Sequence, residues 1–324
     1  MVVFHKIVIP VRPQTDTVIA IFLLKTFGGQ AFPGIESAKC EIMSSLPGSE
    51  SEETLNSKGV VLLDVGGGRF DHHKKAVKTT SADLVAEFLG VADDPAIAKL
   101  LEVARRCDFY GKGTISEDAL DRAFGLSGLI SSFNKVYGAE AGKTVDVFLP
   151  VITAHYQEEV RRTKDMPLEV EGIIKNGKAE TFIVKQRDKK LKVIIIPSDN
   201  PSLSGFLRSR LGGAHDIVAQ VRTTGHLNIL TRPAKRIDLR SLVALIRAEE
   251  LVTRGQGGSF DMRSLSLSGK IESVPQWYYD TATNSLQNGG INTKDVEPTK
   301  LPRASLRKLF EIGLSEELWS PLPR

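Results

Sequence analysis

Apolar and polar positions along the first half of the chain fall into blocks that predict strands and helices in turn. Short apolar, β-branched runs at 6–11 (KIVIPV) and 60–65 (VVLLDV) predict two buried strands. Between them, residues 16–27 carry a helical pattern that two glycines close. Strands that alternate with helices in this way are typical of an α/β domain with a mainly parallel sheet.

More helices are expected after the second strand. Ser81 is the predicted N-cap of a helix over 82–90 (ADLVAEFLG), and a second helix is expected over 95–107 (PAIAKLLEVARRC) with its proline in the first turn. A long helix is predicted near 144–164, whereas the polar run 47–59 (PGSESEETLNSKG) is expected to be a loop.

The pattern changes at 165–172 (DMPLEVEG), and we expect a domain boundary near residue 166. Helices are predicted near 201–211 and 238–252. The predicted strands of this half are 168–174 (LEVEGII), 179–185 (AETFIVK), 191–197 (LKVIIIP), 216–221 (DIVAQV) and 227–231 (LNILT). The expected architecture is therefore a parallel-sheet α/β domain over 1–166 and a smaller α+β domain over 167–324.

Composition narrows the class of protein. With 41% hydrophobic and 25% charged residues among 324, the chain is typical of globular proteins rather than disordered ones. The net charge of +4 is small, but residues 187–254 hold 13 Lys/Arg against 6 Asp/Glu, a bias that suits phosphate groups or a solvated basic face. Two cysteines without a CxxC pattern exclude a disulfide framework. Since the longest apolar run, 17–24, is too short to cross a bilayer, and residues 1–20 show no signal-peptide pattern, a cytoplasmic protein with no membrane partner is expected.

The stretch 61–75 (VLLDVGGGRFDHHKK) concentrates the chemistry-bearing residues. It places two acids and two of the six histidines within ten residues. Asp64 ends a predicted strand, and in parallel sheets ligand sites form at the carboxyl ends of strands. Taken alone, the Asp-His-His run is more often a solvated turn, but the acid upstream and the glycines between favour a site.

Two further acids complete the expected ligand set. Asp16 follows the first strand, and Asp108 follows the helix that ends near Cys107, where a capping role is the competing interpretation. If the glycine turn brings His72 back, three carboxylates and one imidazole converge. These ligands suit Mn²⁺, Mg²⁺ or Fe²⁺ rather than thiolate-binding metals. Such an ion lowers the pKa of a bound water and neutralises phosphoryl charge. His73 is then a candidate to bind phosphate or to act as general acid.

Four motifs carry a family resemblance: 12–16 (RPQTD), 62–68 (LLDVGGG), 70–73 (FDHH) and 107–111 (CDFYG). In this order and spacing they resemble the DHH superfamily of phosphoesterases, which includes exonucleases, small-oligonucleotide phosphodiesterases and family II inorganic pyrophosphatases. The resemblance covers residues 6–112. Beyond residue 166 only the architecture is similar, where the family keeps its substrate-binding DHHA1 domain.

The resemblance implies a metal pair that shares Asp64, but this chain matches the ligands of only one ion. Asp16, His72 and Asp108 match the other ligands of that ion. The second ion's remaining positions correspond to Pro10 and Gln14, which offer no ionised ligand. The resemblance therefore implies a site for one ion, most simply Mn²⁺ or else Mg²⁺ or Fe²⁺, and leaves open whether it supports catalysis.

Candidate phosphate ligands are Arg12 and, in the second half, Arg208, Arg210 and His226, with ordinary surface arginines as the equally weighted alternative. Trp277 to Tyr279 could stack a base, although such aromatics are usually core. Cys107 is expected to be a buried thiol.

The preferred function is a divalent-metal-dependent phosphohydrolase, in which a metal-activated water attacks the phosphorus of a small phosphorylated metabolite, a nucleotide or a short oligonucleotide. The alternative is a catalytically impaired DHH-like protein that binds a phosphorylated ligand or nucleic acid without turnover. A nucleic-acid-binding module that uses the basic half is less favoured, and would show a steep loss of affinity with salt. A homodimer is possible for such a family.

Overall fold

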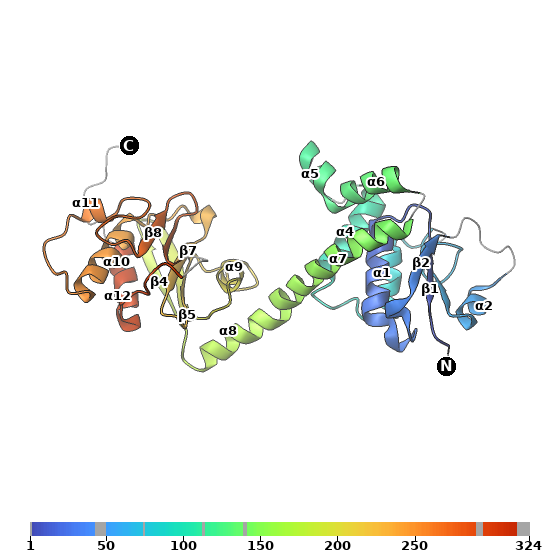
Figure 1. The fold of residues 1–324 in the computed structure, drawn as a ribbon, viewed down its shortest axis with the longest axis horizontal. Coiled ribbons are helices and arrows are strands. Elements are labelled where there is room, and N and C mark those ends of the chain that lie inside the picture. Colours follow the sequence, from blue (N-terminus) through green and yellow to red (C-terminus); the bar gives the residue numbers. More distant parts are fainter. Residues whose placement is uncertain are drawn as a thin grey trace. The chain divides into compact units, whose positions relative to one another are not determined.

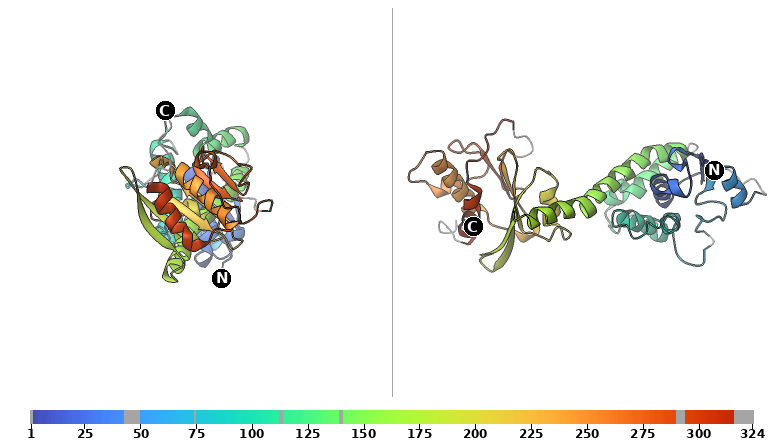
Figure 2. Two further views of the ribbon diagram at one scale, coloured as in Figure 1. Left: turned by 90° about the vertical axis from the view of Figure 1, so that its left-hand side faces the viewer. Right: turned by 90° about the horizontal axis from the view of Figure 1, so that it is seen from below.

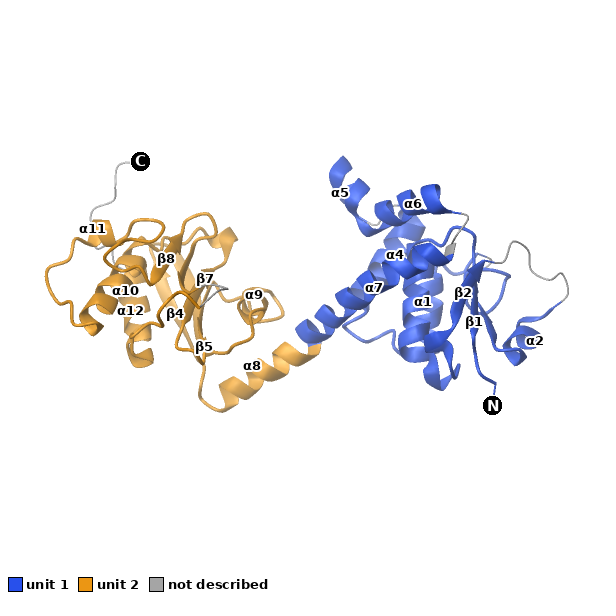
Figure 3. Cartoon of the chain, viewed as in Figure 1, with its two compact units in different colours: residues 1–163 blue, residues 164–324 orange. Residues whose placement is uncertain are grey.

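The computed structural model describes residues 2–42, 50–73, 75–111, 114–138, 141–289 and 294–315, and the structural statements that follow concern these residues. The chain divides into two compact units, residues 1–163 and 164–324 (Figure 3). Both units combine helices with a sheet, so the mixed α/β class expected from the sequence is confirmed.

Unit 1 contains a three-stranded parallel sheet of β1 (Lys6–Ile9), β2 (Lys39–Ile42) and β3 (Val60–Leu62) in the order β2-β1-β3. Strands β1 and β2 are labelled side by side in Figure 1. The central strand β1 presents Ile7, Val8 and Ile9, all buried, because a strand flanked on both sides and covered on both faces has no solvent-facing position. This sheet places the ends of β1 and β3 next to each other.

Helix α1 (Thr15–Phe27) forms the centre of the unit 1 core. Its residues from Thr15 to Leu24 are all buried, and it packs against α3, α4 and α7. The remaining helices of this unit are α2 (Glu52–Ser57), α3 (Ser81–Phe88), α4 (Ala98–Tyr110), α5 (Ala119–Phe124), α6 (Leu126–Tyr137) and α7 (Ala141–Val160). A helix that is apolar on all sides needs neighbours on all sides, and these provide them.

Several predicted boundaries in unit 1 are wrong by a few residues. Helix α4 begins at Ala98 rather than at Pro95, because the proline lies in a preceding turn that the Asp94 carboxylate stabilises through the Ala96 N–H. It continues to Tyr110, so Asp108 lies in its last turn rather than after the helix. The run 47–59 also contains α2, which Ser51 caps.

The N-cap of α3 is Thr80, not Ser81. Thr80 Oγ1 accepts a hydrogen bond of 3.1 Å from Asp83 N, and Asp83 Oδ2 accepts one of 3.2 Å from Thr80 N, which is a capping box. Ser81, one residue inside the helix, is thereby free for another contact.

Unit 2 contains a mixed six-stranded sheet in the order β4-β5-β6-β7-β9-β8. Only β5 and β6 are parallel neighbours. The strands are β4 (Glu180–Gln186), β5 (Lys189–Pro197), β6 (Ile217–Val221), β7 (Leu227–Thr231), β8 (Trp277–Asp280) and β9 (Ser285–Asn288). The helices are α8 (Met166–Lys175), α9 (Leu203–Arg208), α10 (Arg240–Thr253), α11 (Met262–Leu265) and α12 (Arg303–Ser315).

Helices cover both faces of this sheet. Along β5, Val193 and Ile195 belong to the core cluster with α10 and α12, whereas Ile194 and Ile196 belong to the cluster with α8 and α9. The period-2 alternation of a strand sends neighbours to opposite faces, so a run of four apolar residues serves two cores. Helices α10 (orange) and α12 (red) lie side by side in Figure 2.

The predicted strand 168–174 is wrong, because these residues form most of α8. The alternation in LEVEGII imitates a strand, yet Met166, Val170 and Ile173 are spaced for one face of a helix and pack in one cluster against β5. Leu168 and Ile174 consequently lie on the exposed side, at 67% and 51%. Pro167, in the first turn of α8, suits a helix start and not a strand interior.

Among the described helices, the apolar segments are all too short or too polar to span a bilayer.

Candidate metal centre

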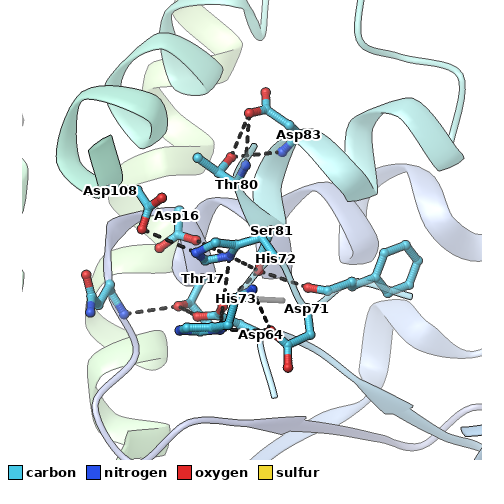
Figure 4. Close-up of polar contacts among 12 residues, drawn as sticks. Asp16, Thr17, Asp64, Asp71, His72, His73, Thr80, Ser81, Asp83 and Asp108 are labelled. Atoms are coloured by element: carbon cyan, nitrogen blue, oxygen red, sulfur yellow. Dashed lines mark hydrogen bonds and ion pairs between the residues drawn. The ribbon is translucent and has the colours of Figure 1, made fainter. Parts of the chain in front are cut away.

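Asp64 lies just beyond β3 with its backbone in the left-handed region, at φ 59°. Gly66 and Gly67 follow with φ of 77° and 71°, so the chain turns back sharply, and Asp64 N reaches Phe70 O at 3.2 Å. Such values suit glycine and tolerate aspartate. The glycine turn therefore returns residues 71–73 to the end of β3, as the sequence predicted (Figure 4).

Asp71 holds this turn together. Its Oδ2 accepts a 2.6 Å hydrogen bond from Gly67 N, and its Oδ1 accepts one of 3.0 Å from His73 N and lies 2.8 Å from His73 Nδ1. Burial opposes ionisation of Asp71, but these hydrogen bonds offset it and lower the pKa of the carboxyl. Asp71 is thus an ionised residue whose hydrogen bonds stabilise the turn between Gly67 and His73.

His72 stands among three carboxylates (Figure 4). Its Nδ1 lies 3.3 Å from Asp64 Oδ1 and 3.9 Å from Asp16 Oδ2, and its Nε2 lies 3.3 Å from Asp108 Oδ1. Two overlapping triads have ligand atoms within 4.8 Å of one another: Asp16, His72 and Asp108, and Asp64, His72 and His73. The structure thus brings together all four residues that the sequence suggested as ligands.

Asp16 is the most electrostatically strained member of the site. It is 2% exposed, and its Oδ2 is one of the buried oxygens with no hydrogen-bond partner in the described structure. Burial, and then the charges of Asp64 and Asp108, raise the pKa of Asp16 to about 7. An unpartnered, buried carboxylate oxygen facing like charges is what a cation would stabilise.

Two hydroxyl groups hold Asp64. Thr17 Oγ1 donates to Asp64 Oδ2 at 2.7 Å, and Ser81 Oγ donates to Asp64 Oδ1 at 2.9 Å. Burial nevertheless raises the pKa of Asp64. The sequence pattern does not predict either contact, because it places Thr17 at the start of a helix and Ser81 at a helix cap. The only signal for Ser81 was Thr80 beside it, a second residue able to cap the helix.

Ser81 also sets the tautomer of His72. Ser81 Oγ lies 3.2 Å from His72 Nδ1. Ser81 Oγ lies 2.9 Å from two groups that can only accept, Asp64 Oδ1 and Phe70 O. Because its single proton goes to one of them, we assign the imidazole proton to Nδ1, from which it points to Ser81. The lone pair of Nε2 then faces Asp108 Oδ1. Two electron pairs 3.3 Å apart repel unless a cation lies between them, and outer hydrogen bonds of this kind orient histidine ligands.

Pro10 and Gln14, the two positions without an ionised ligand, bring no carboxylate or imidazole of their own to the centre. Pro10 follows β1, and Gln14 is exposed, with its backbone N–H donating to Thr17 Oγ1 at 3.1 Å. His5 is exposed at the opposite end of the strand. In their place the structure offers His73, whose Nδ1 lies 3.7 Å from Asp64 Oδ1.

Cys107 is only partly buried, contrary to the expectation of a buried thiol. It lines a cavity of about 600 Å³ together with Arg12, Gln14 and Thr15. The helix α4 turns its side chain toward this space because the core of unit 1 is contacted by other positions, Leu100, Leu101 and Ala104. Arg12 is therefore the predicted phosphate ligand that lies in unit 1, in a cavity also lined by the residues that precede Asp16 and Asp108.

The other predicted phosphate ligands lie in unit 2. The guanidinium of Arg208 donates to the carbonyl groups of Ser204 and Thr231, and burial lowers its pKa. His226 uses both ring nitrogens, with Nδ1 2.9 Å from Thr224 Oγ1 and Nε2 2.9 Å from Val296 O. These contacts give Arg208 and His226 structural partners, whereas Arg210 is exposed. Their phosphate roles stay predictions.

The aromatic run near the end of the chain mostly belongs to the core. Trp277 is fully buried and Tyr279 is 6% exposed, while Tyr278, at 44%, is the only member with a ring available to solvent. A single exposed ring does not make a platform for successive bases.

Comparison with known proteins places the chain in no described group. No family model matches it, and no curated protein matches it. One similar solved structure is that of an uncharacterized protein from Helicobacter pylori G27, at 11% identity, covering 95% of this chain and 98% of the other. The TM-score of 0.24 is too low to carry an inference about fold or function.

Proposed function

We propose that the protein is a divalent-metal-dependent phosphoesterase, similar in its first unit to the DHH phosphoesterases, that binds one ion of Mn²⁺, Mg²⁺ or Fe²⁺. Asp16, Asp64, His72 and Asp108 are its ligands. The observation that carries the proposal is the placement of three carboxylates 3.3–3.9 Å from one imidazole, with a buried oxygen of Asp16 left unpartnered.

The donor set supports a hard or borderline cation. Carboxylate oxygens with one imidazole suit Mn²⁺, Mg²⁺ or Fe²⁺. Without a cation, one of the clustered acids must take up a proton near neutral pH, as the raised pKa of Asp16 indicates. A bound divalent cation supplies charge that neutralises a phosphoryl oxygen and lowers the pKa of a coordinated water.

His73 is placed to handle a proton. The hydrogen bond with Asp71, at 2.8 Å, raises the pKa of His73, which keeps the imidazole protonated closer to neutral pH. Its side chain is 63% exposed, so a phosphate ester can reach it. We assign His73 the role of donating a proton to the leaving oxygen.

The direct test is the metal content of protein purified without chelators, measured by mass spectrometry for wild type, His72→Ala and His155→Ala. His155 is exposed on α7, so His155→Ala removes an imidazole outside the centre and serves as the control. We expect about one Mn or Fe per chain in wild type and in His155→Ala, and none in His72→Ala. No bound metal in wild type, even after incubation with excess Mn²⁺, would contradict the proposal.

Hydrolysis is tested separately with bis(p-nitrophenyl) phosphate and p-nitrophenyl phosphate. Cleavage should require added Mn²⁺ and disappear in Asp64→Asn, because that variant keeps the side-chain shape and removes the ligand charge.

The second candidate is a protein that binds a phosphorylated ligand on the same scaffold without turnover. Pro10 and the exposed Gln14 favour it, since a two-metal clamp on attacking and leaving oxygens cannot form with these residues. Ligand binding that persists in EDTA, with no hydrolysis under any metal, identifies this alternative.

A further inference from the structure

The cavity of about 600 Å³ in unit 1 is formed by chain segments that also carry metal ligands. Thr15 and Cys107 line it, and each immediately precedes a ligand of the candidate centre. The cavity therefore adjoins the metal centre. Its volume is in the range of small-molecule sites.

The wall of the cavity is cationic. Arg12, Arg122 and Lys135 line it, and the described lining residues include no carboxylate. None of the three cations forms an ion pair within the described part of the chain. By contrast, Lys99 and Arg105 of the same unit pair with Glu159 and Asp83. Unpaired cations around one hollow form a positive field that attracts anions.

Buried hydrogen bonds hold two of these cations at the same cavity. Asn134, at 6% exposure, donates through Nδ2 to Pro13 O at 2.8 Å and accepts through Oδ1 from Thr144 Oγ1 at 2.8 Å. This ties α6, which carries Lys135, to the segment after β1, which carries Arg12. Asn134 is itself a lining residue, so a buried hydrogen-bonded side chain fixes the wall that carries these two cations.

We propose that this cavity binds the second phosphate of a small bisphosphorylated metabolite whose other phosphoryl group lies at the metal centre. The inference rests on the proposed function, because it names the substrate class of the same site. Arginine forks bind phosphate through paired hydrogen bonds, and a lysine adds a point charge. A cavity of about 600 Å³ is large enough for a phosphorylated sugar or nucleoside.

The first experiment uses metal-free protein and isothermal titration calorimetry with fructose 1,6-bisphosphate. The cavity variants are Arg12→Gln, Arg122→Gln and Lys135→Gln. The control is Lys39→Gln, which removes one positive charge from an exposed position on β2, outside the cavity. We expect each cavity variant to weaken binding by about tenfold, in line with one lost charge-assisted contact, and Lys39→Gln to change it less than twofold. Equal binding by wild type and the triple cavity variant would overturn the inference, as would an equal loss in Lys39→Gln.

The second experiment adds Ca²⁺, chosen to fill the centre without supporting turnover, and compares fructose 1,6-bisphosphate with fructose 6-phosphate. Wild type should prefer the bisphosphate by tenfold or more, and the triple variant should lose this preference while its Mn²⁺ content stays unchanged. If wild type binds no metal but the cavity variants still weaken binding of the bisphosphate, the proposed function alone is refuted. Intact metal binding without a bisphosphate preference refutes the substrate class alone.

Discussion

The hydroxyl of Thr17 donates a hydrogen bond of 2.7 Å to Oδ2 of Asp64, a residue 47 positions later in the chain. This bond joins the first turn of α1 to the end of β3, and it fixes the carboxylate of the candidate triad of Asp64, His72 and His73. The position of the Asp64 carboxylate in the candidate centre therefore depends on how α1 packs against the sheet.

Replacing Thr17 with valine removes this bond without a change in shape. Thr17 is fully buried, so we expect Thr17→Val to lower the free energy of unfolding by about 1–2 kcal/mol and to weaken Mn²⁺ binding by about 10–100-fold. Denaturant unfolding and metal titration measure the two effects. The control is Thr153→Val, which removes a hydroxyl bonded to Leu149 O within α7 and should leave metal affinity unchanged. Unaltered Mn²⁺ affinity in Thr17→Val would show that Asp64 is not a ligand oriented by this bond.

The raised pKa of Asp16 predicts how the stability of the metal-free protein depends on pH. The folded pKa of about 7 lies above the unfolded value of 3.8, so the folded state binds the extra proton between these values. The contribution of Asp16 to stability is then largest at low pH and is lost as pH rises from about 4 through 7. Thermal unfolding in EDTA should show this fall, and added Mn²⁺ should reverse it at pH 8.

Asp16→Asn should remove this pH dependence. At pH 8 the metal-free variant should exceed wild type in free energy of unfolding, by an amount on the order of a few kcal/mol, and it should gain nothing from Mn²⁺. Asp93→Asn changes an exposed acid and serves as the control, with a pH profile equal to that of wild type. A metal-free Asp16→Asn less stable than wild type at pH 8 contradicts the assigned charge strain.

The left-handed backbone of Asp64 predicts an unusual order of substitutions. At φ 59° alanine is strained by about 1 kcal/mol and glycine is not, so Asp64→Gly should be more stable than Asp64→Ala. At Asp16, inside α1, the order should reverse, because a helix favours alanine over glycine. Chemical unfolding of the four variants without metal measures both differences. The same order at both positions would rule out backbone strain at Asp64.

Glu250 is the centre of a buried polar network in unit 2, and its charge is predicted to stabilise that unit. Its Oε1 accepts from Arg254 Nε at 2.7 Å and from Lys300 N at 3.0 Å, and its Oε2 accepts from Trp277 Nε1 at 3.1 Å. Glu250→Gln replaces one carboxylate oxygen, which accepts hydrogen bonds, with an NH₂ group that donates them and that would face the N–H donors of the network. We expect a loss of about 2–4 kcal/mol in the free energy of unfolding, against less than about 0.5 kcal/mol for the neighbouring, half-buried Glu249→Gln. Similar losses in the two variants would mean that the network contributes no net stability.

The pattern of apolar residues predicts secondary structure correctly where a segment is buried along its whole length. The runs 6–11 and 60–65 were predicted as strands and contain β1 and β3, because a parallel strand covered on both faces is apolar throughout. Pattern failed at 168–174, where alternation and helical spacing coincide over a short run and only contact with β5 distinguishes them. The hairpin of β8 and β9 was not predicted, since each strand is four residues long and pairs with the sheet only in the folded unit.

The sequence by itself determined the types of ligand at the candidate centre: acids and a histidine placed at the ends of predicted strands and helices. Only the tertiary structure decided their mutual distances, the unpartnered oxygen of Asp16, and the two hydroxyls that hold Asp64. It also decided that Arg12, Arg122 and Lys135 share one cavity. The physical reason is that residue types and local spacing are written along the chain, whereas desolvation and charge proximity arise only when segments far apart in sequence pack together.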